Sequence, residues 1–186
     1  MGSNNDISLK ALAKINLGLD VVRRREDGYH EVRMIMQTIH LYDRLDIKRT
    51  KEPGIQIQTN LSFLPVNENN LIYKAAKLLM DEFSITDGVS VKLDKRIPVA
   101  AGMAGGSTDA AAMLIGVNRL FSLGLTKRQL MERGVQIGAD VPYCIMRGTA
   151  LAEGIGEALS PLPPMVKCPV LICLLYTSPS PRDYAA

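Results

Sequence analysis

The segment with the clearest chemical signature is the run PVAAGMAGGSTDAAAML at residues 98–114, which leads from a loop into a helix. Gly102, Gly105 and Gly106 carry no Cβ, so the backbone there can adopt positive φ and approach a ligand closely. Ser107 is a good N-cap candidate. The unpaired N–H groups of a helix's first turn and the positive end of its dipole favour a bound anion. The run therefore predicts a phosphate-binding loop; its alternative is a tight turn packed with small residues.

The spacing within this run excludes two common phosphate motifs. No Gly-Lys-Ser/Thr follows the glycines, so the loop is not a Walker A motif. The spacing Gly-x-Gly-x-x-Gly is also absent, which excludes the dinucleotide fingerprint.

Lys14 and Asp140 are the residue types that phosphoryl transfer to a hydroxyl needs beside such a loop. Lys14 lies on the polar side of an alternating segment, and Asn16 projects from the same face. Asp140 lies in the motif GADVP at residues 138–142. A carboxylate can accept the hydroxyl proton, and a lysine beside it keeps it ionised and stabilises developing negative charge. Taken singly, Lys14 is more simply a surface lysine and Asp140 a turn cap.

Four motifs in this order resemble the GHMP kinase superfamily: AKINLGL at 13–19, DGYH at 27–30, the run at 98–114 and GADVP at 138–142. The resemblance covers about residues 7–173. The loop alone indicates only the superfamily. The AKIN and DGYH motifs are more specific to members that phosphorylate a cytidine diphosphate-linked methylerythritol in non-mevalonate isoprenoid biosynthesis.

The resemblance implies a role for each polar candidate. Asp140 is the expected base towards the 2-hydroxyl of the substrate, Lys14 its charged partner, and Asn16 a substrate-positioning residue. Tyr29 and His30 are expected to hold the cytidine end, by stacking and by hydrogen bonds to the base edge. Without the resemblance, they are a turn aromatic and a surface histidine.

The resemblance also implies ATP as cofactor, with Mg²⁺ as its counterion. We expect Mg²⁺ to contact phosphates, water and a loop hydroxyl such as that of Ser107, with no dedicated metal site. The residues expected to bind the ATP phosphates are Pro98, Val99, Ala100, Ala101, Gly102, Met103, Ala104, Gly105, Gly106, Ser107 and Thr108.

The chain departs from the family pattern in its loop and in its length. The family often has glycine at the positions of Ala100, Ala101 and Ala104, and we interpret these alanines as variation that negative φ tolerates. Thr108 replaces a serine and keeps the hydroxyl. Family members carry a second α+β domain that completes the substrate cleft. We therefore expect the chain as given to be weakly active or inactive.

Apolar periodicity predicts the elements that position these groups. Strands are expected near residues 15–21, 32–41, 45–47, 55–58, 89–93, 143–146 and 149–152, and helices over 72–83, from Ser107 to about 123, and over 127–138. This order predicts an α+β fold, a ribosomal-protein-like mixed sheet with helices packed on one side, and the second domain missing.

The expected organisation has three parts. Residues 1–160 form an ATP-binding N-terminal domain, and residues 161–175 a linker and the first strand, over 170–175, of a truncated C-terminal domain. Residues 176–186, rich in serine and proline, are expected to be a disordered, non-native tail.

Composition excludes several other classes of protein. At 47% hydrophobic residues and a formal charge of +3, the chain can bury a core and carries no basic stripe for nucleic acid. The 3 cysteines lack CxxC spacing, which argues against zinc and fits a reducing cytoplasm, and no segment is long enough to span a membrane. A homodimer is possible. Two alternatives stay open: another GHMP kinase, for homoserine, mevalonate or a sugar, and a non-catalytic ATP-binding fragment.

Overall fold

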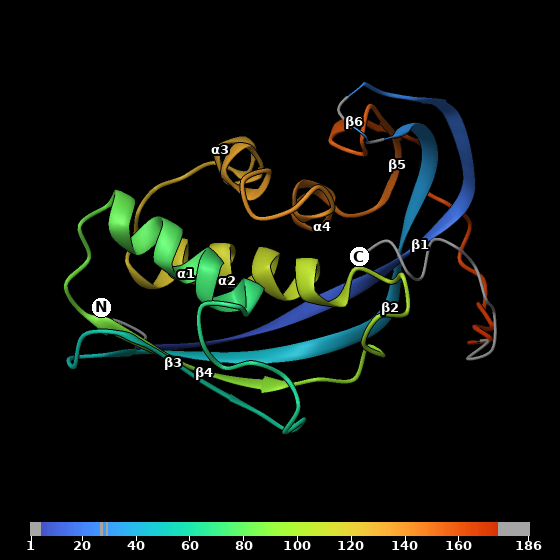
Figure 1. Ribbon diagram of the computed structural model, residues 1–186. Helices are drawn as coiled ribbons and strands as arrows, with labels where there is room; N and C mark the ends of the chain where they lie inside the picture. The colour runs from blue at the N-terminus through green and yellow to red at the C-terminus, as the bar shows by residue number, and fades with distance from the viewer. Residues whose placement is uncertain (1–4, 27, 29, 175–186) are drawn as a thin grey trace.

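The computed structural model describes residues 5–26, 28 and 30–174 of the chain. After three strands, the chain forms one helix, one strand, three successive helices and two final strands (Figure 1). The strands are β1 (Asp6–Arg24), β2 (His30–Thr50), β3 (Ile55–Thr59), β4 (Gly88–Asp94), β5 (Thr149–Glu153) and β6 (Ala158–Pro161). The helices are α1 (Leu71–Glu82), α2 (Gly105–Leu120), α3 (Lys127–Gly134) and α4 (Val141–Met146).

Strand β2 organises the sheet because it pairs with three other strands. β1 runs antiparallel along one edge of β2. On the other edge, β4 pairs with residues 44–50 and β5 with residues 34–37, both antiparallel. β3 joins β4 in parallel and β6 joins β5 in antiparallel orientation, so the sheet is mixed. The chain that leaves β4 turns away from β2 between these two paired stretches, and the site described below is built there.

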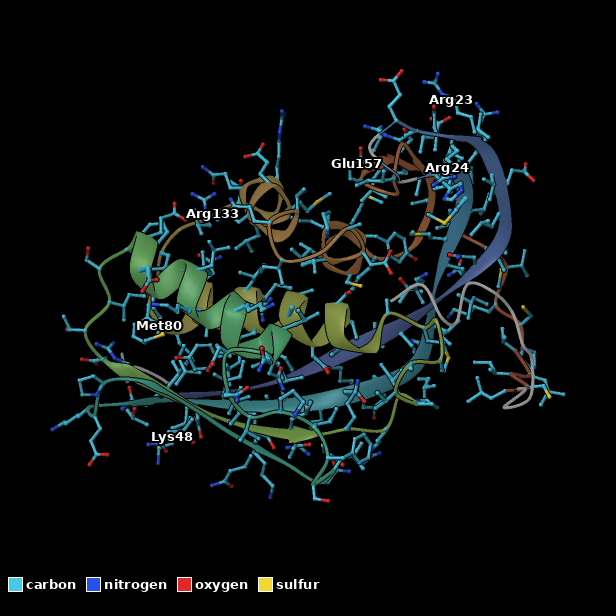
Figure 2. The ribbon with its side chains drawn as sticks, viewed as in Figure 1. Arg23, Arg24, Lys48, Met80, Arg133 and Glu157 are labelled. Carbon is cyan, nitrogen blue, oxygen red and sulfur yellow. The ribbon has the colours of Figure 1, made fainter. Side chains whose placement is uncertain are left out.

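The helices all cover one face of the sheet (Figure 1). α2 packs on β1 and β2 and also contacts α1 and α4. In β2, Leu45 and Ile47 are buried under this helical layer, while the alternate residues Arg44 and Lys48 are exposed on the other face. Figure 2 shows Lys48 on the side of the sheet away from the helices. The α+β fold with a mixed sheet and helices on one side is therefore confirmed.

Two of the expected helices begin at a capping side chain. The Asn70 side chain accepts a hydrogen bond from the N–H of Ile72 and caps α1. Thr126 and Gln129 form a reciprocal capping box at the start of α3. None of the helices described here is both long and apolar enough to cross a membrane.

Two predicted strands are wrong. Residues 143–146 belong to helix α4, where Pro142 occupies the first turn and its fixed φ favours a helix start. A short apolar run does not by itself distinguish a buried strand from a buried helix.

The second error concerns the segment after residue 160. Pro161 ends strand β6 rather than opening a linker, and no described residue from 162 to 174 is in a strand. Instead, the N–H of Leu162 donates to the carbonyl of Thr149, and the N–H of Met165 donates to Thr149 Oγ1. A strand needs a neighbour for its backbone groups, and no ladder of the described part includes this segment. The tail predicted over residues 176–186 lies outside the described residues.

Candidate active site

A cavity of about 900 Å³ opens where β1, the segment after β4 and the start of α2 meet. That volume is within the range of small-molecule sites. It gathers most of the residues that the sequence singles out. Its lining includes Lys14, Asn16, Asp140 and every residue from 98 to 107.

The start of α2 leaves its backbone donors without a capping side chain. The helix begins at Gly105, and its N-cap is Ala104, which has φ 56° and makes no side-chain cap. Ser107 is therefore inside the first turn and is not the N-cap that the sequence suggests. Because no side chain caps this end, the first-turn N–H groups can receive an anion from the cavity.

The three loop glycines serve two different purposes. Gly102 has φ +69°, the left-handed region that favours glycine. Gly105 and Gly106 do not have positive φ, but a Cβ at Gly105 would lie 2.7 Å from Lys95 Nζ and one at Gly106 would lie 3.3 Å from Leu71 Cδ1. Tight packing, which was the alternative reading of this loop, therefore explains the last two glycines.

The loop alanines do not all have negative φ, contrary to the sequence-based interpretation. Ala100 has φ 59° and Ala104 has φ 56°, whereas Ala101 is not among the residues with positive φ. An L-residue in the left-handed region is strained by roughly 1–2 kcal/mol because its Cβ approaches the following carbonyl oxygen. Strained residues are often found at binding sites.

Replacing Ala104 with glycine is expected to raise the free energy of unfolding by about 1 kcal/mol, because it removes the left-handed strain. The matched control is Ala101→Gly in the same loop, which is expected to lower stability by roughly 0.5–1 kcal/mol through backbone entropy. Urea denaturation measures both. Equal losses in the two variants would show that Ala104 is not strained.

Lys14 and Asp140 meet inside the cavity. Lys14 Nζ lies 3.7 Å from Asp140 Oδ2 and donates to Asn16 Oδ1 at 3.3 Å. Lys14 is buried and Asp140 is partly exposed. Asp140 is the N-cap residue of α4, but its side chain makes no capping hydrogen bond, so the simpler reading as a turn cap is wrong. The pair is present in the structure, and its catalytic role stays a prediction.

Backbone contacts hold this pair against the loop. The register between β1 and β2 shifts between Leu12 and Lys14, and such bulges often redirect a side chain. The N–H of Lys14 then donates to the carbonyl of Met103 at 3.2 Å, and Thr108 Oγ1 donates to the carbonyl of Leu12 at 2.8 Å. β1 is therefore hydrogen-bonded to the loop that precedes α2 and to the first turn of α2.

A second set of contacts fixes helix α4, which carries Asp140. The Tyr143 hydroxyl donates to the carbonyl of Gly148 at 2.7 Å and lies 3.0 Å from Thr38 Oγ1 of β2. Burial raises the pKa of Tyr143 to about 12, so this hydroxyl keeps its proton at neutral pH. Asp140 therefore rests on a helix that is hydrogen-bonded to the central strand.

Two predicted site residues, Thr108 and His30, do not line this cavity. Thr108 is only 2% exposed and does not line the cavity. Its hydroxyl donates to the carbonyl of Leu12, so the first turn of α2 packs directly on β1. His30 begins β2 opposite Arg24, at the far end of the β1–β2 hairpin (Figure 2), and also does not line the cavity. Tyr29 lies outside the described residues.

Sequence reasoning missed three buried charged residues beside the loop: Asp43, Lys95 and Asp109. Lys95 and Asp109 also line the cavity. Burial, followed by the negative charge of Asp43, raises the pKa of Asp109, while Lys95 opposes this shift. For Asp43 the sequence did contain a signal of burial, because this residue occupies an apolar position in the alternating series Ile39, Leu41, Leu45 and Ile47.

Cys144 follows Asp140 on α4, and burial, then the nearby Asp140 carboxylate, raises the pKa of its thiol to about 12. At pH 8 we expect iodoacetamide to modify the exposed Cys168 and Cys173 but not Cys144, because only the thiolate reacts. Peptide mass spectrometry reads this out. The pKa of Cys144 in the folded protein exceeds the ordinary value of 9.0, so the folded protein keeps this proton to a higher pH than the unfolded chain does. The free energy of unfolding therefore falls as the pH rises from 9 towards 12. Modification of Cys144 at the rate of the other two would contradict its burial.

The chain is similar to known proteins in sequence and in structure. The family model for the GHMP kinases N terminal domain matches residues 70–148. A protein of Lachnoclostridium phytofermentans named 4-diphosphocytidyl-2-C-methyl-D-erythritol kinase is 63% identical over 166 residues, which are 89% of this chain and 57% of that protein. A protein of Lachnospira eligens with the same name is also 63% identical, and the match covers 58% of it. The chain thus spans little more than half the length of these relatives.

Solved structures agree with the sequence comparison. A crystal structure of 4-(cytidine 5'-diphospho)-2C-methyl-D-erythritol kinase is 38% identical, with a TM-score of 0.74 over 84% of this chain and 55% of that one. A homoserine kinase from Cytophaga hutchinsonii has a TM-score of 0.68 at 16% identity over 88% of this chain and 53% of its own, which shows a shared fold alone.

Proposed function

We propose that this chain belongs to the GHMP kinase family and is part of an enzyme that transfers phosphate from ATP to the 2-hydroxyl of 4-diphosphocytidyl-2-C-methyl-D-erythritol. The observation that carries the proposal is the Lys14–Asp140 ion pair of 3.7 Å inside the cavity that the phosphate loop lines. The names of the close relatives support the choice of substrate.

Asp140 is proposed as the base for the acceptor hydroxyl. Its carboxylate is partly exposed in the cavity and accepts no capping hydrogen bond, so it can reach a substrate proton. The ammonium of Lys14, 3.7 Å from this carboxylate, is placed to stabilise negative charge on the transferred phosphoryl group. Asn16, which already contacts Lys14, is placed to orient the acceptor.

The loop and the first turn of α2 are proposed to hold the ATP phosphates. The residues present fit such an anion, because the helix start carries no capping side chain and the loop lines a cavity of adequate volume. Mg²⁺ fits as a partner of the nucleotide, since it needs few protein oxygens besides phosphates and water. In this cavity the Ser107 hydroxyl is the candidate contact, and the cation would neutralise phosphate charge.

The cytidine end and the wider organisation remain proposals. We propose that Tyr29 and His30 bind the cytosine at the end of the hairpin, and that the domain predicted for residues 1–160 is the nucleotide-binding unit. A homodimer stays a possible assembly.

The test measures phosphoryl transfer from ATP to three acceptors: the cytidine-bearing alcohol, homoserine and mevalonate. It uses this chain and a chimera in which the C-terminal part of the Lachnoclostridium relative follows residue 161. We expect transfer only to the cytidine-bearing alcohol, with the chimera far more active than the chain. Transfer to another acceptor would refute the substrate, and ATP binding without transfer to any would favour a non-catalytic nucleotide-binding fragment.

A further inference from the structure

Three charged side chains lie buried side by side beneath the phosphate loop. Asp43 is 0%, Lys95 8% and Asp109 3% exposed. They come from β2, from the residue that follows β4, and from α2, so the cluster joins three segments that are distant in sequence. A charge removed from water is costly unless it is paired and hydrogen-bonded, so each member needs a reason to be there.

Asp43 holds the chain as it leaves the sheet. The ladder between β2 and β4 ends with Arg44 opposite Asp94. Beyond that point the Asp43 carboxylate replaces the backbone of β2 as the acceptor. Its Oδ1 accepts hydrogen bonds from the N–H groups of Arg96, at 2.5 Å, and Ile97, at 2.7 Å. Its Oδ2 accepts a hydrogen bond from Lys95 Nζ. Asp43 therefore has a complete structural role.

Lys95 connects this anchor to the start of α2. The Asn60 side chain bonds to both its backbone N–H, at 2.8 Å, and its carbonyl, at 3.1 Å, so the base of Lys95 is fixed. A Cβ at Gly105 would lie 2.7 Å from Lys95 Nζ, so the ammonium packs directly against the first residue of α2. Lys95 Nζ also lies 3.1 Å from Asp109 Oδ2.

Asp109 is the member of the cluster whose polar atoms are not all satisfied. Lys95 is already paired by Asp43, and Asp109 adds a second carboxyl group to the same ammonium. Asp109 Oδ1 is also buried with no hydrogen-bond partner among the described residues. An unsatisfied buried oxygen lowers stability. Replacing Asp109 does not leave the Lys95 ammonium unpaired, because Asp43 still pairs with it. A group retained at the expense of stability points to a role in function.

We propose that Asp109 is a positioning residue, which holds the Lys95 ammonium against Gly105 and thereby fixes the first turn of α2 and its preceding loop for nucleotide phosphates. Asp109 acts through Lys95 and the backbone, since its side chain is nearly fully buried and its Oδ2 lies 3.1 Å from Lys95 Nζ. The inference rests on the proposed function, because it assigns the fixed loop to nucleotide binding.

The test compares Asp109→Leu, which removes the contact to Lys95, with Asp109→Asn, which keeps an oxygen acceptor. Three quantities are measured on the whole chain: amide hydrogen exchange of residues 98–106, ATP affinity by calorimetry, and the urea midpoint. We expect faster loop exchange and ATP binding weaker by up to roughly a hundredfold in Asp109→Leu, with the asparagine variant in between. The urea midpoint of Asp109→Leu is expected to be unchanged or raised. Met113→Leu, a buried swap in the same helix, is the control and should change none of the three.

Unchanged loop exchange and ATP affinity in Asp109→Leu would overturn the proposal. A lowered urea midpoint with faster exchange throughout the chain would also overturn it, since Asp109 would then be an ordinary stabilising partner. If the wild-type chain binds no ATP, the proposed function of this chain fails. The hydrogen exchange of the loop would still decide whether Asp109 positions it.

Discussion

Asparagine in place of Asp140 is expected to lower kcat for phosphoryl transfer by roughly 10²–10⁴-fold, the usual contribution of a general base. The amide keeps the shape of the carboxylate and can still accept a hydrogen bond, but it cannot take the proton of the acceptor hydroxyl. Lys14 also loses its counter-ion at 3.7 Å. ATP affinity should change little, because the loop and the start of α2 hold the phosphates. Steady-state kinetics and calorimetry on the chimera supply both values.

The control for this variant is Asp46→Asn on the outer face of the sheet. Asp46 pairs with Arg44 on the exposed side of β2 and does not line the cavity, so the same chemical change there should leave kcat unaltered. A kcat equal to that of wild type in Asp140→Asn would exclude Asp140 as the base. A loss of ATP affinity equal to the loss of kcat would instead assign it to nucleotide binding.

Asp43→Ala is expected to lower the free energy of unfolding by about 3–5 kcal/mol, the usual effect of breaking a buried ion pair from one side. The N–H groups of Arg96 and Ile97 would lose their acceptor, and Lys95 would keep only Asp109 as a partner. Urea denaturation monitored by circular dichroism measures the loss.

Asp46→Ala in the same strand provides the comparison for stability. Its ion pair with Arg44, at 3.0 Å, is exposed and is expected to contribute about 0–1 kcal/mol. Equal effects at the two positions would mean that the carboxylate of Asp43 is not the anchor of the segment that leaves β4.

The sequence anticipated the parts of this molecule that depend on local chemistry. Asn70 and Thr126 mark helix starts because a side-chain oxygen within a few residues satisfies the first N–H groups. The alternation of β1 places Lys14 and Asn16 on one face, and their side chains are hydrogen-bonded in the structure. That Lys14 meets Asp140 depends on tertiary packing, which only the coordinates display.

The parts that the sequence did not predict depend on contacts between distant segments. The apolar residues of α4 suit a strand as well as a helix, and its packing against α2 and α3 decides in favour of the helix. Ala104, with φ 56°, is the residue at which the loop joins the start of α2, and nothing in its residue type predicts this conformation. The link between Asp43 and Lys95 is also invisible to local patterns, although a charge on the apolar face of β2 was a signal of it.

The most direct test of the central claim, that this cavity binds the phosphates of ATP, is a titration of the isotope-labelled chain with a non-hydrolysable ATP analogue and Mg²⁺, followed by amide NMR. We predict saturable shifts centred on Met103, Ala104, Gly105, Gly106 and Ser107, with smaller shifts at Lys14 and Asp140. Absence of saturable binding, or shifts confined to residues outside the cavity, would contradict the claim.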